Sequence, residues 1–338
     1  MSLLPRALAV FCTLVFTLPG WAEVTVKELP DRVRIELDGK LFTELRFSGA
    51  QHSYLWPLLG PDGAKLTRSW PMEEAPGEEH DHVHHRSVWF GHGLVNGVDF
   101  WTEDATHGTK KPKHPVGTIV HEKILTAKGG ASEGVVAASQ RWVAPDGAVP
   151  ITSIQTVRVL QTPPEERLFD FQVQMTAGTK DVLFGDTKEG TFAMRIAESM
   201  RLKQAKNQPG KGQIVNSEGL TDAKAWGAAA KWVAMSGPID GKPYTIAVFD
   251  HPANLRHPTR WHARDYGLFA ANPFCVKEMD LSKKHPEGAG DFTLAAGKDL
   301  TLRYRVFVHT GAPNSTLINE RFAQFAKDTQ PLSNSPKP

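Results

Sequence analysis

Apolar and polar residues alternate strictly along several stretches of the chain. In the segment 32–37, Val33, Ile35 and Leu37 alternate with Arg and Glu, and the same period of two recurs over 168–175 and 300–308. A period of two places one face of a strand in the core and the other in water, as in antiparallel sheets. Strand-like runs bounded by turn residues predict further strands over 41–47, 118–125, 135–143, 151–160, 191–196, 231–235 and 245–249.

The C-terminal segment is the one that convincingly has the spacing of a helix. After a capping residue, Asn314 or Ser315, apolar residues recur at helical intervals: Leu317, Ile318, Phe322, Phe325 and Ala326. The sequence shows neither βαβ alternation nor a glycine fingerprint for a nucleotide. We therefore expect an all-β protein, with one large antiparallel β-sandwich over residues 23–329, a C-terminal helix packed on it, and a flexible tail over 330–338.

The first 22 residues have the pattern of a secretory signal peptide. Arg6 precedes an apolar run over 7–18, a Pro-Gly pair ends that run, and small residues suited to signal peptidase follow. We expect cleavage after Ala22 and a periplasmic or secreted mature protein; the alternative is a retained N-terminal anchor. No later stretch approaches the ~18 consecutive apolar residues that indicate a membrane-spanning helix.

Composition excludes several classes of protein. The 338 residues include 39 Lys and Arg against 37 Asp and Glu, a net charge of +2, so no strong field favours nucleic acid or an anionic membrane. Apolar residues make up 40%, which is ordinary for a folded protein. Because Cys12 would leave with the signal peptide, Cys275 would stand alone, and no intramolecular disulfide could form.

Five of the 14 histidines lie between residues 80 and 92: His80, His82, His84, His85 and His92. In an extended chain the first three would project to one side and His85 to the other. Neutral imidazoles grouped in this way can bind a transition metal, act as general acids or bases, or hydrogen-bond a polyol. The spacing does not choose among these roles, and a histidine-rich loop packed on Trp89 and Phe90 is the structural alternative.

A tight Asn96-Gly97 turn follows and is expected to bring Asp99 and Trp101 back near His92. A second cluster covers 251–266, where prolines forbid a regular helix and favour a fixed loop of the kind that binds ligands. A solvated basic loop is the alternative there. Between the clusters, Glu189 precedes a predicted strand and is a candidate inward-facing carboxylate; a plain surface turn is the alternative.

These motifs resemble a bacterial family of unknown function labelled "methane oxygenase PmoA-like". The matching stretches are 84–93, 95–101, 188–192, 249–252, 256–258 and 261–273. The resemblance implies similarity to mutarotase-like and glycan-lyase sandwich proteins, hence a supersandwich and a carbohydrate ligand, but it implies no settled activity. A membrane oxygenase subunit needs several spanning helices, which this sequence lacks after its first segment.

Three functions fit these residues. The first is a carbohydrate-active enzyme, a hydrolase or lyase of glycosides or oligosaccharides, with epimerisation also open and acid–base catalysis by histidine and carboxylate. The second is a non-catalytic glycan-binding protein, and the third is an enzyme that holds a divalent metal in its histidine clusters. All three require the two clusters to line one hollow.

We assign site residues for the first function. The predicted catalytic residues are His85, His92, Asp99, Glu189, His262 and Asp265. The predicted substrate-binding residues, with Trp101 and Trp261 as platforms for sugar rings, are Arg86, Asn96, Trp101, His257, Trp261, Arg264, Tyr266 and Asn272.

Overall fold

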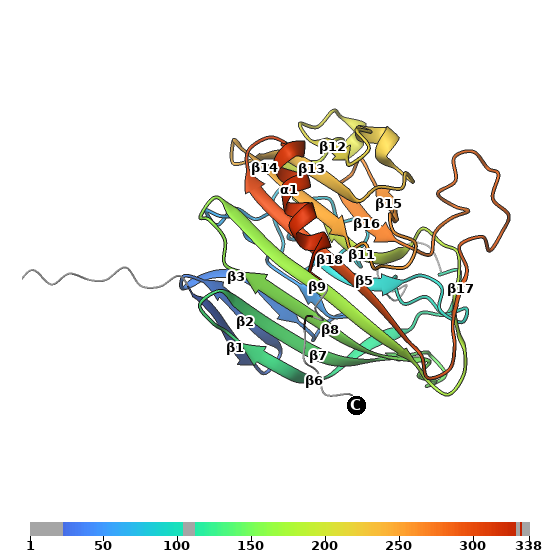
Figure 1. Cartoon of the computed structure of the whole chain (residues 1–338). Helices are drawn as coiled ribbons and strands as arrows, with labels where there is room; N and C mark the ends of the chain where they lie inside the picture. Colours follow the sequence, from blue (N-terminus) through green and yellow to red (C-terminus); the bar gives the residue numbers. More distant parts are fainter. Residues whose placement is uncertain (1–22, 104–111, 329–331, 333–338) are drawn as a thin grey trace, which may run out of the picture.

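Two eight-stranded sheets dominate the computed structural model, which describes residues 23–103, 112–328 and 332 (Figure 1). Neighbouring strands pair antiparallel in both sheets. The first sheet contains, in spatial order, β1 (Val24–Leu29), β2 (Arg32–Leu37), β3 (Lys40–Arg46), β4 (Tyr54–Leu55), β5 (Val88–His92), β11 (Gly190–Arg195), β16 (Leu268–Asn272) and β15 (Arg260–Ala263).

The second sheet carries the longer strands. It contains, in spatial order, β12 (Gln213–Asn216), β13 (Trp232–Ile239), β14 (Lys242–Asp250), β18 (Asp299–Thr310), β9 (Glu166–Ala177), β8 (Ile151–Leu160), β7 (Glu133–Val143) and β6 (Thr118–Lys128). A separate pair joins β10 (Val182–Phe184) to β17 (Phe292–Leu294). Three short 3-10 helices cover Glu198–Met200, Ala205–Asn207 and Asp222–Ala225.

The core lies between the two sheets, and the alternating stretches supply it. Val33 and Ile35 of β2 and Phe169 and Phe171 of β9 are at most 1% exposed and belong to one apolar cluster. Every strand predicted from the sequence overlaps an observed strand. The expected all-β fold, a large antiparallel sandwich with a C-terminal helix, is confirmed.

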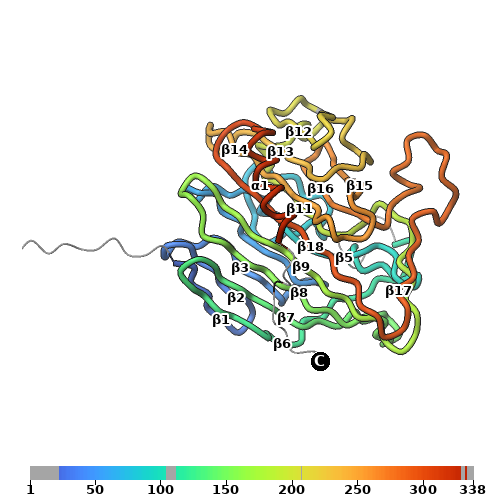
Figure 2. The backbone as a smooth tube through the Cα atoms, viewed as in Figure 1, coloured from blue at the N-terminus to red at the C-terminus, as the bar shows by residue number. Residues whose placement is uncertain are grey.

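The two sheets meet along one edge of the sandwich. Val24 and Gly130 exchange backbone hydrogen bonds of 2.9 and 3.0 Å, which ties β1 to the turn between β6 and β7. Figure 2 shows these strands side by side at the lower left of the molecule. This contact joins the two sheets at the first residue of β1.

The helix α1 (Ser315–Ala326) covers part of the outer face of the second sheet (Figure 1). Asn314 caps it, because its side chain accepts a hydrogen bond from the backbone N–H of Leu317 at 3.1 Å. Ile318 and Phe325 are fully buried against an apolar patch of β9, β13, β14 and β18. The sheet therefore has apolar contacts on both faces where the helix lies.

A second apolar layer covers the outer face of the first sheet. Along β5, Val88 and Phe90 point into the core, whereas Trp89 points away from it. The outer layer consists of Tyr54, Trp89, Trp101, Ala193, Leu268 and Ala270. Because this face is also covered, polar groups placed on it are shielded from water, and this face carries the site described below.

The predicted signal segment, 1–22, lies outside the described residues, as does the predicted tail apart from Leu332, which is buried. Cys275 is a buried free thiol, and burial raises its pKa. Across the described parts of the chain, no helix combines the length and apolar character needed to cross a membrane.

Candidate functional site

A cavity of about 600 Å³ brings together segments that are far apart in the chain. It is bounded by the segment between β4 and β5, the turns after β5, the loop before β11, and β15 with its following turn. The residues that line it are His82, His84, His85, Gly93, Leu94, Asp99, Thr102, Pro112, Lys113, His114, Asp186, Thr187, Lys188, Glu189, His262, Arg264, Tyr266 and Glu278.

The two histidine-rich clusters therefore meet at one cavity. His85 of the first cluster and His262, Arg264 and Tyr266 of the second line it, together with Glu189 from the loop before β11. Asp99 also lies on its wall. Six of the fourteen residues assigned to the site from the sequence are placed here.

Successive side chains of β15 point to opposite faces of the sheet, and this alternation decides which residue reaches the cavity. His262 pairs with Ala270 in the outer layer, whereas Trp261 pairs with Ala271 in the core. Trp261 is fully buried and its Nε1–H donates to the carbonyl of Ala230 at 2.8 Å, so its ring offers no face to a sugar. The predicted platform role of Trp261 is corrected on this ground.

His262 is held neutral by its surroundings. Burial, followed by the positive charges of Arg264 and Lys188, lowers the pKa of His262 to about 3. Its Nδ1 is buried without a hydrogen-bond partner among the described residues. The ring is thus a neutral imidazole at physiological pH, able to bond a ligand that enters the cavity.

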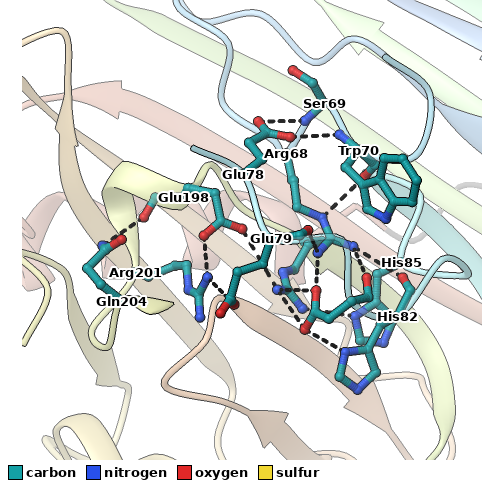
Figure 3. Close-up of polar contacts among 12 residues, drawn as sticks. Arg68, Ser69, Trp70, Glu78, Glu79, His82, His85, Glu198, Arg201 and Gln204 are labelled. Atoms are coloured by element: carbon teal, nitrogen blue, oxygen red, sulfur yellow. Dashed lines mark hydrogen bonds and ion pairs between the residues drawn. The ribbon is translucent and has the colours of Figure 1, made fainter. Parts of the chain in front are cut away.

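The segment that carries the first cluster is not extended. His82 has a positive φ of 45°, and the backbone N–H of His85 donates to the carbonyl of His82 at 2.9 Å, which closes a turn. As a result the rings of His82 and His85 stack, 4.5 Å apart and 9° from parallel, instead of facing opposite ways (Figure 3). His84 meets His85 edge-on at 4.5 Å.

A buried guanidinium organises this turn. Arg68 is fully buried and donates to four backbone carbonyls of the segment, those of Trp70, Glu79, Asp81 and His82, at 2.9 to 3.2 Å (Figure 3). A turn without regular secondary structure leaves such carbonyls without partners, so Arg68 satisfies them and fixes the path of the chain.

Asp81 lies between two guanidinium groups and one imidazole. Its carboxylate accepts from Arg195 Nη2 at 3.0 Å, from Arg68 Nη1, and from His82 Nδ1 at 2.6 Å. Burial alone would raise the pKa of Asp81, but the hydrogen bond from His82 and the charges of Arg195 and Arg68 lower that pKa well below its usual range. Asp81 is therefore ionised.

Arg195, on the last position of β11, links this carboxylate to His85. Its Nη1 lies 3.1 Å from Nδ1 of His85, and its guanidinium carbon lies 4.8 Å from the ring centre of Tyr266. Burial, then the neighbouring His84 and Arg195, keep the pKa of His85 well below its usual value. Burial first, then nearby imidazoles, lower the pKa of His84 to about 3.

The sequence assigned no role to Arg68, Asp81 or Arg195, and it placed His82 in the histidine cluster without assigning it to the site. A signal for Arg195 was available, because it is the single charged residue at the end of an apolar strand, where a charge needs buried partners. His82 was assigned to the opposite side from His85 because the segment was treated as extended.

The carboxylates that line the cavity have different hydrogen-bond partners. Oδ1 of Asp99 accepts the backbone N–H groups of Trp101 and Thr102, at 2.8 and 2.9 Å, so Asp99 builds its own turn. Asp186 likewise accepts backbone N–H groups at 2.7 to 3.2 Å, those of Val276, Lys277 and Gly290. Both side chains hold loops in place.

Glu189 instead pairs with a side chain. Its Oε1 lies 3.0 Å from Nζ of Lys188, and one-third of the Glu189 side chain is exposed (33%). Burial alone would lower the pKa of Lys188, but Glu189 and Glu278 offset this effect and raise it. Glu189 therefore faces the cavity beside a fixed positive charge.

Arg264 and Tyr266 separate the cavity from a second one of about 420 Å³, and both residues line the two. The Arg264 guanidinium lies 5.4 Å from the ring centre of Tyr266 and forms no ion pair with the described residues. Burial raises the pKa of Tyr266 to about 12, so its hydroxyl stays protonated. Asp265 lines the second cavity, 3.8 Å from Nζ of Lys203, and not the first.

Other predicted residues of the first cluster lie outside the cavity. His92 is buried, with Nε2 2.9 Å from the Gly185 carbonyl, and burial lowers its pKa to about 4. The Asn96-Gly97 turn does bring the chain back, since the Phe100 N–H donates to the His92 carbonyl at 3.0 Å. However, the Asn96 side chain accepts from the Leu183 N–H instead of a ligand.

Four more predicted residues have structural partners. Trp101 is fully buried in the outer apolar layer and offers no ring face. Arg86 pairs with Glu103, with one bond of 2.8 Å. His257 Nδ1 lies 2.7 Å from Asp250, and its ring stacks on Phe322 beside α1. The buried Asn272 side chain donates to the carbonyl of Thr187 at 2.8 Å, which positions the loop before Glu189.

The histidine clusters do not form a metal centre within the described residues. No three His, Cys, Asp or Glu side chains converge there in an arrangement that could hold a metal ion. The imidazoles of His82, His84 and His85 stack or meet edge-on, and two of them are engaged with Asp81 and Arg195.

Several solved structures are similar to this chain. A galactose mutarotase-like protein from Lactobacillus casei ATCC 334 has 10% identity and a TM-score of 0.41, covering 85% of this chain and 100% of its own. An aldose epimerase homologue from C. elegans has 8% identity and a TM-score of 0.34, covering 86% and 99%. A polysaccharide lyase has 12% identity and a TM-score of 0.31; this chain is 87% covered and spans 33% of the lyase.

No curated protein matches the sequence. A family model does match it, over residues 32–323, and is described as a family of unknown function, DUF6807. The expected membership of a family of unknown function is confirmed in this form, without the oxygenase label. The match covers most of the sequence, and the chain belongs to the DUF6807 family.

Proposed function

We propose that this protein is a carbohydrate-active enzyme that acts on a sugar bearing a carboxylate, by elimination at the carbon next to that group. The observation that carries the proposal is that the neutral imidazoles of His85 and His262 line one cavity with the guanidinium of Arg264, which has no ion-pair partner among the described residues. An imidazole can transfer a proton or donate a hydrogen bond to an oxygen that gains charge, and a guanidinium binds planar carboxylates in a two-point geometry.

The polarity of the cavity supports a sugar ligand. Pockets for apolar ligands are lined mainly by hydrophobic side chains with few polar groups. This cavity presents five imidazoles together with hydroxyl, ammonium and carboxylate groups. Such a lining matches a ligand with hydroxyl groups on most of its carbons.

The carboxylates argue against hydrolysis as the reaction. Glycosidases need two carboxyl groups that flank the scissile bond. Of the four carboxylates in the cavity, Asp99 and Asp186 accept backbone N–H groups, and Glu278 accepts that of Lys188 at 2.7 Å. Among the described residues that line the cavity, Glu189 is the remaining carboxylate, and it is paired with Lys188.

Arg264 supplies what an elimination needs. Removal of the proton next to a carboxylate places negative charge on the carboxylate oxygens in the transition state. A guanidinium that forms no ion pair with the described carboxylates is free to bind those oxygens and stabilise the charge as it develops. The predicted signal segment would deliver such an enzyme to the periplasm or the exterior, where acidic polysaccharides are met.

The test is an assay on matched oligosaccharides with and without uronate units. We expect an unsaturated product, detected by its ultraviolet absorbance, from uronate substrates alone. Arg264→Gln should raise KM about 10- to 100-fold, and His262→Gln should lower kcat/KM. His257→Gln, which alters a histidine beside α1, is the control and should act as wild type. Incorporation of water into the product, or tight binding without product, would overturn the proposal.

A further inference from the structure

The stacked imidazoles of His82 and His85 are both linked to the carboxylate of Asp81. His82 contacts it directly, and His85 is linked to it through Arg195. We infer that Asp81 and Arg195 give His82 and His85 opposite tautomers, so that His82 is the base of the reaction and His85 is a hydrogen-bond donor to the developing negative charge. This inference rests on the proposed function and assigns the groups that carry it out.

The tautomer of His85 follows from its contact with Arg195. A guanidinium has only N–H donors, so at 3.1 Å from Nη1 of Arg195 the Nδ1 of His85 must accept. The proton of the neutral ring therefore resides on Nε2. Arg195 cannot reverse this arrangement, because Asp81 holds its other terminal nitrogen at 3.0 Å.

The tautomer of His82 follows from its contact with Asp81. An ionised carboxylate only accepts, so the Nδ1 of His82, 2.6 Å from Oδ2, must donate. The neutral ring then carries a lone pair on Nε2. The side chain of His82 lines the cavity and is 43% exposed, so a ligand in the cavity can reach this ring.

The two rings cannot exchange roles. If the neutral His85 lost its Nε2 proton it would become an imidazolate, so it polarises an oxygen without transferring the proton, as a neutral imidazole does in some isomerases. His82 can become an imidazolium, because the adjacent Asp81 carboxylate stabilises the new charge. The ring centres are 4.5 Å apart and both residues line the cavity, so the two functions lie next to each other in its wall.

In the elimination that these roles imply, His82 alone carries the proton. Nε2 of His82 takes the proton from the carbon next to the carboxylate, and the C–H electron pair forms the new C=C bond as the bond to the leaving oxygen breaks. His85 Nε2–H and Arg264 bind the oxygens that gain charge. The His82 imidazolium then returns its proton to the leaving oxygen, which restores the neutral ring.

The tautomers can be measured without a substrate. Two-dimensional NMR of ¹⁵N-histidine-labelled protein at pH 8 reports which ring nitrogen carries the proton, and His82→Gln and His85→Gln assign the signals. We expect the proton on Nε2 in His85 and on Nδ1 in His82. In Asp81→Asn we expect His82 to show a mixture of tautomers. The reverse tautomer in either ring, or two protons on His82 at pH 8, would overturn the inference.

Kinetics separate this inference from the proposed function. On a uronate substrate, His82→Gln should lower kcat about 10²- to 10⁴-fold and His85→Gln about 10²-fold. His80→Gln is the matched control from the same segment, because His80 stacks on Trp70 outside the cavity, and it should retain wild-type kcat. Turnover of uronates with His82→Gln at the wild-type kcat would refute the role of His82 and leave the proposed function standing.

Discussion

Nη1 of Arg195 lies 3.1 Å from Nδ1 of His85, and both side chains are at most 1% exposed. A buried cation in contact with an imidazole excludes protonation of that ring and fixes the direction of its hydrogen bonds. The chemistry of the cavity therefore depends on a residue that does not line it.

Arg195→Lys tests this dependence. A lysine keeps the charge but has one nitrogen, which cannot bridge Asp81 and His85 as the planar guanidinium does. We expect kcat on uronates to fall at least about 10-fold, with KM little changed, and the His85 ring to populate both tautomers by ¹⁵N NMR. Full kcat in a correctly folded Arg195→Lys protein would contradict the role of Arg195 in fixing the His85 tautomer.

The stability of the fold should decrease on mild acidification. The pKa of His262 is lowered to about 3 and that of His92 to about 4, from 6.5, mainly by burial. Between pH 6.5 and these values the unfolded chain binds more protons than the folded one, so each such group reduces stability by about 1.4 kcal/mol per pH unit as pH falls. We expect the urea midpoint to fall steadily from pH 7 to pH 4.5, and less steeply in His262→Gln. A flat profile over this range would contradict these pKa values.

Asp81 governs a window that begins at about pH 4, where the histidine window ends. Its pKa lies well below the usual value, so the stability that it contributes is complete above about pH 4 and is lost as the pH falls further. Asp81→Asn should remove that part of the acid dependence while leaving the loss between pH 7 and 4.5 in place. Thermal denaturation of both proteins between pH 2.5 and 5 would show the difference.

Trp261 and His262 are adjacent in β15 but should respond oppositely to substitution. Trp261→Ala empties a fully buried site in the core and should cost about 3–5 kcal/mol of unfolding free energy, with little change in KM of the folded protein. His262→Gln should leave stability at pH 8 nearly unchanged and lower kcat/KM. A large rise in KM with Trp261→Ala would instead restore its predicted role as a sugar platform.

Asn314→Ala tests the end of α1. The Asn314 side chain accepts the Leu317 N–H at 3.1 Å, so its removal leaves that donor without a protein partner. We expect a loss of about 1 kcal/mol in unfolding free energy and unchanged turnover, because α1 lies on the second sheet. Asn314→Asp, which keeps an acceptor at the cap, should restore most of the loss.

The alternating stretches sufficed to predict the long strands, because every second residue in them is apolar and points to the buried face. The strands of the site were harder to predict. In β15 the two residues Trp261 and His262 are both buried, since apolar side chains also cover the outer face of the first sheet. With both faces covered, composition no longer tells which residue points to the core.

The site could be predicted in outline only. The high density of imidazole and guanidinium groups in the sequence identified the two clusters. It did not predict how the side chains of each cluster are arranged. His82 was misplaced because its positive φ turns the chain where alternation assumes a straight strand. Arg68 and Arg195 were missed because their contacts with Asp81 join residues more than ten positions apart in the sequence, which only the fold brings together.

The second sheet contributes no side chain to either cavity within the described part of the chain. Drift in its solvent-facing positions can then proceed without altering catalysis, whereas the loops of the first sheet cannot vary so freely. Under the proposed function, relatives that act on different acidic sugars should accordingly diverge between β4 and β5 and around β15, and variants made in those loops are the ones expected to change specificity.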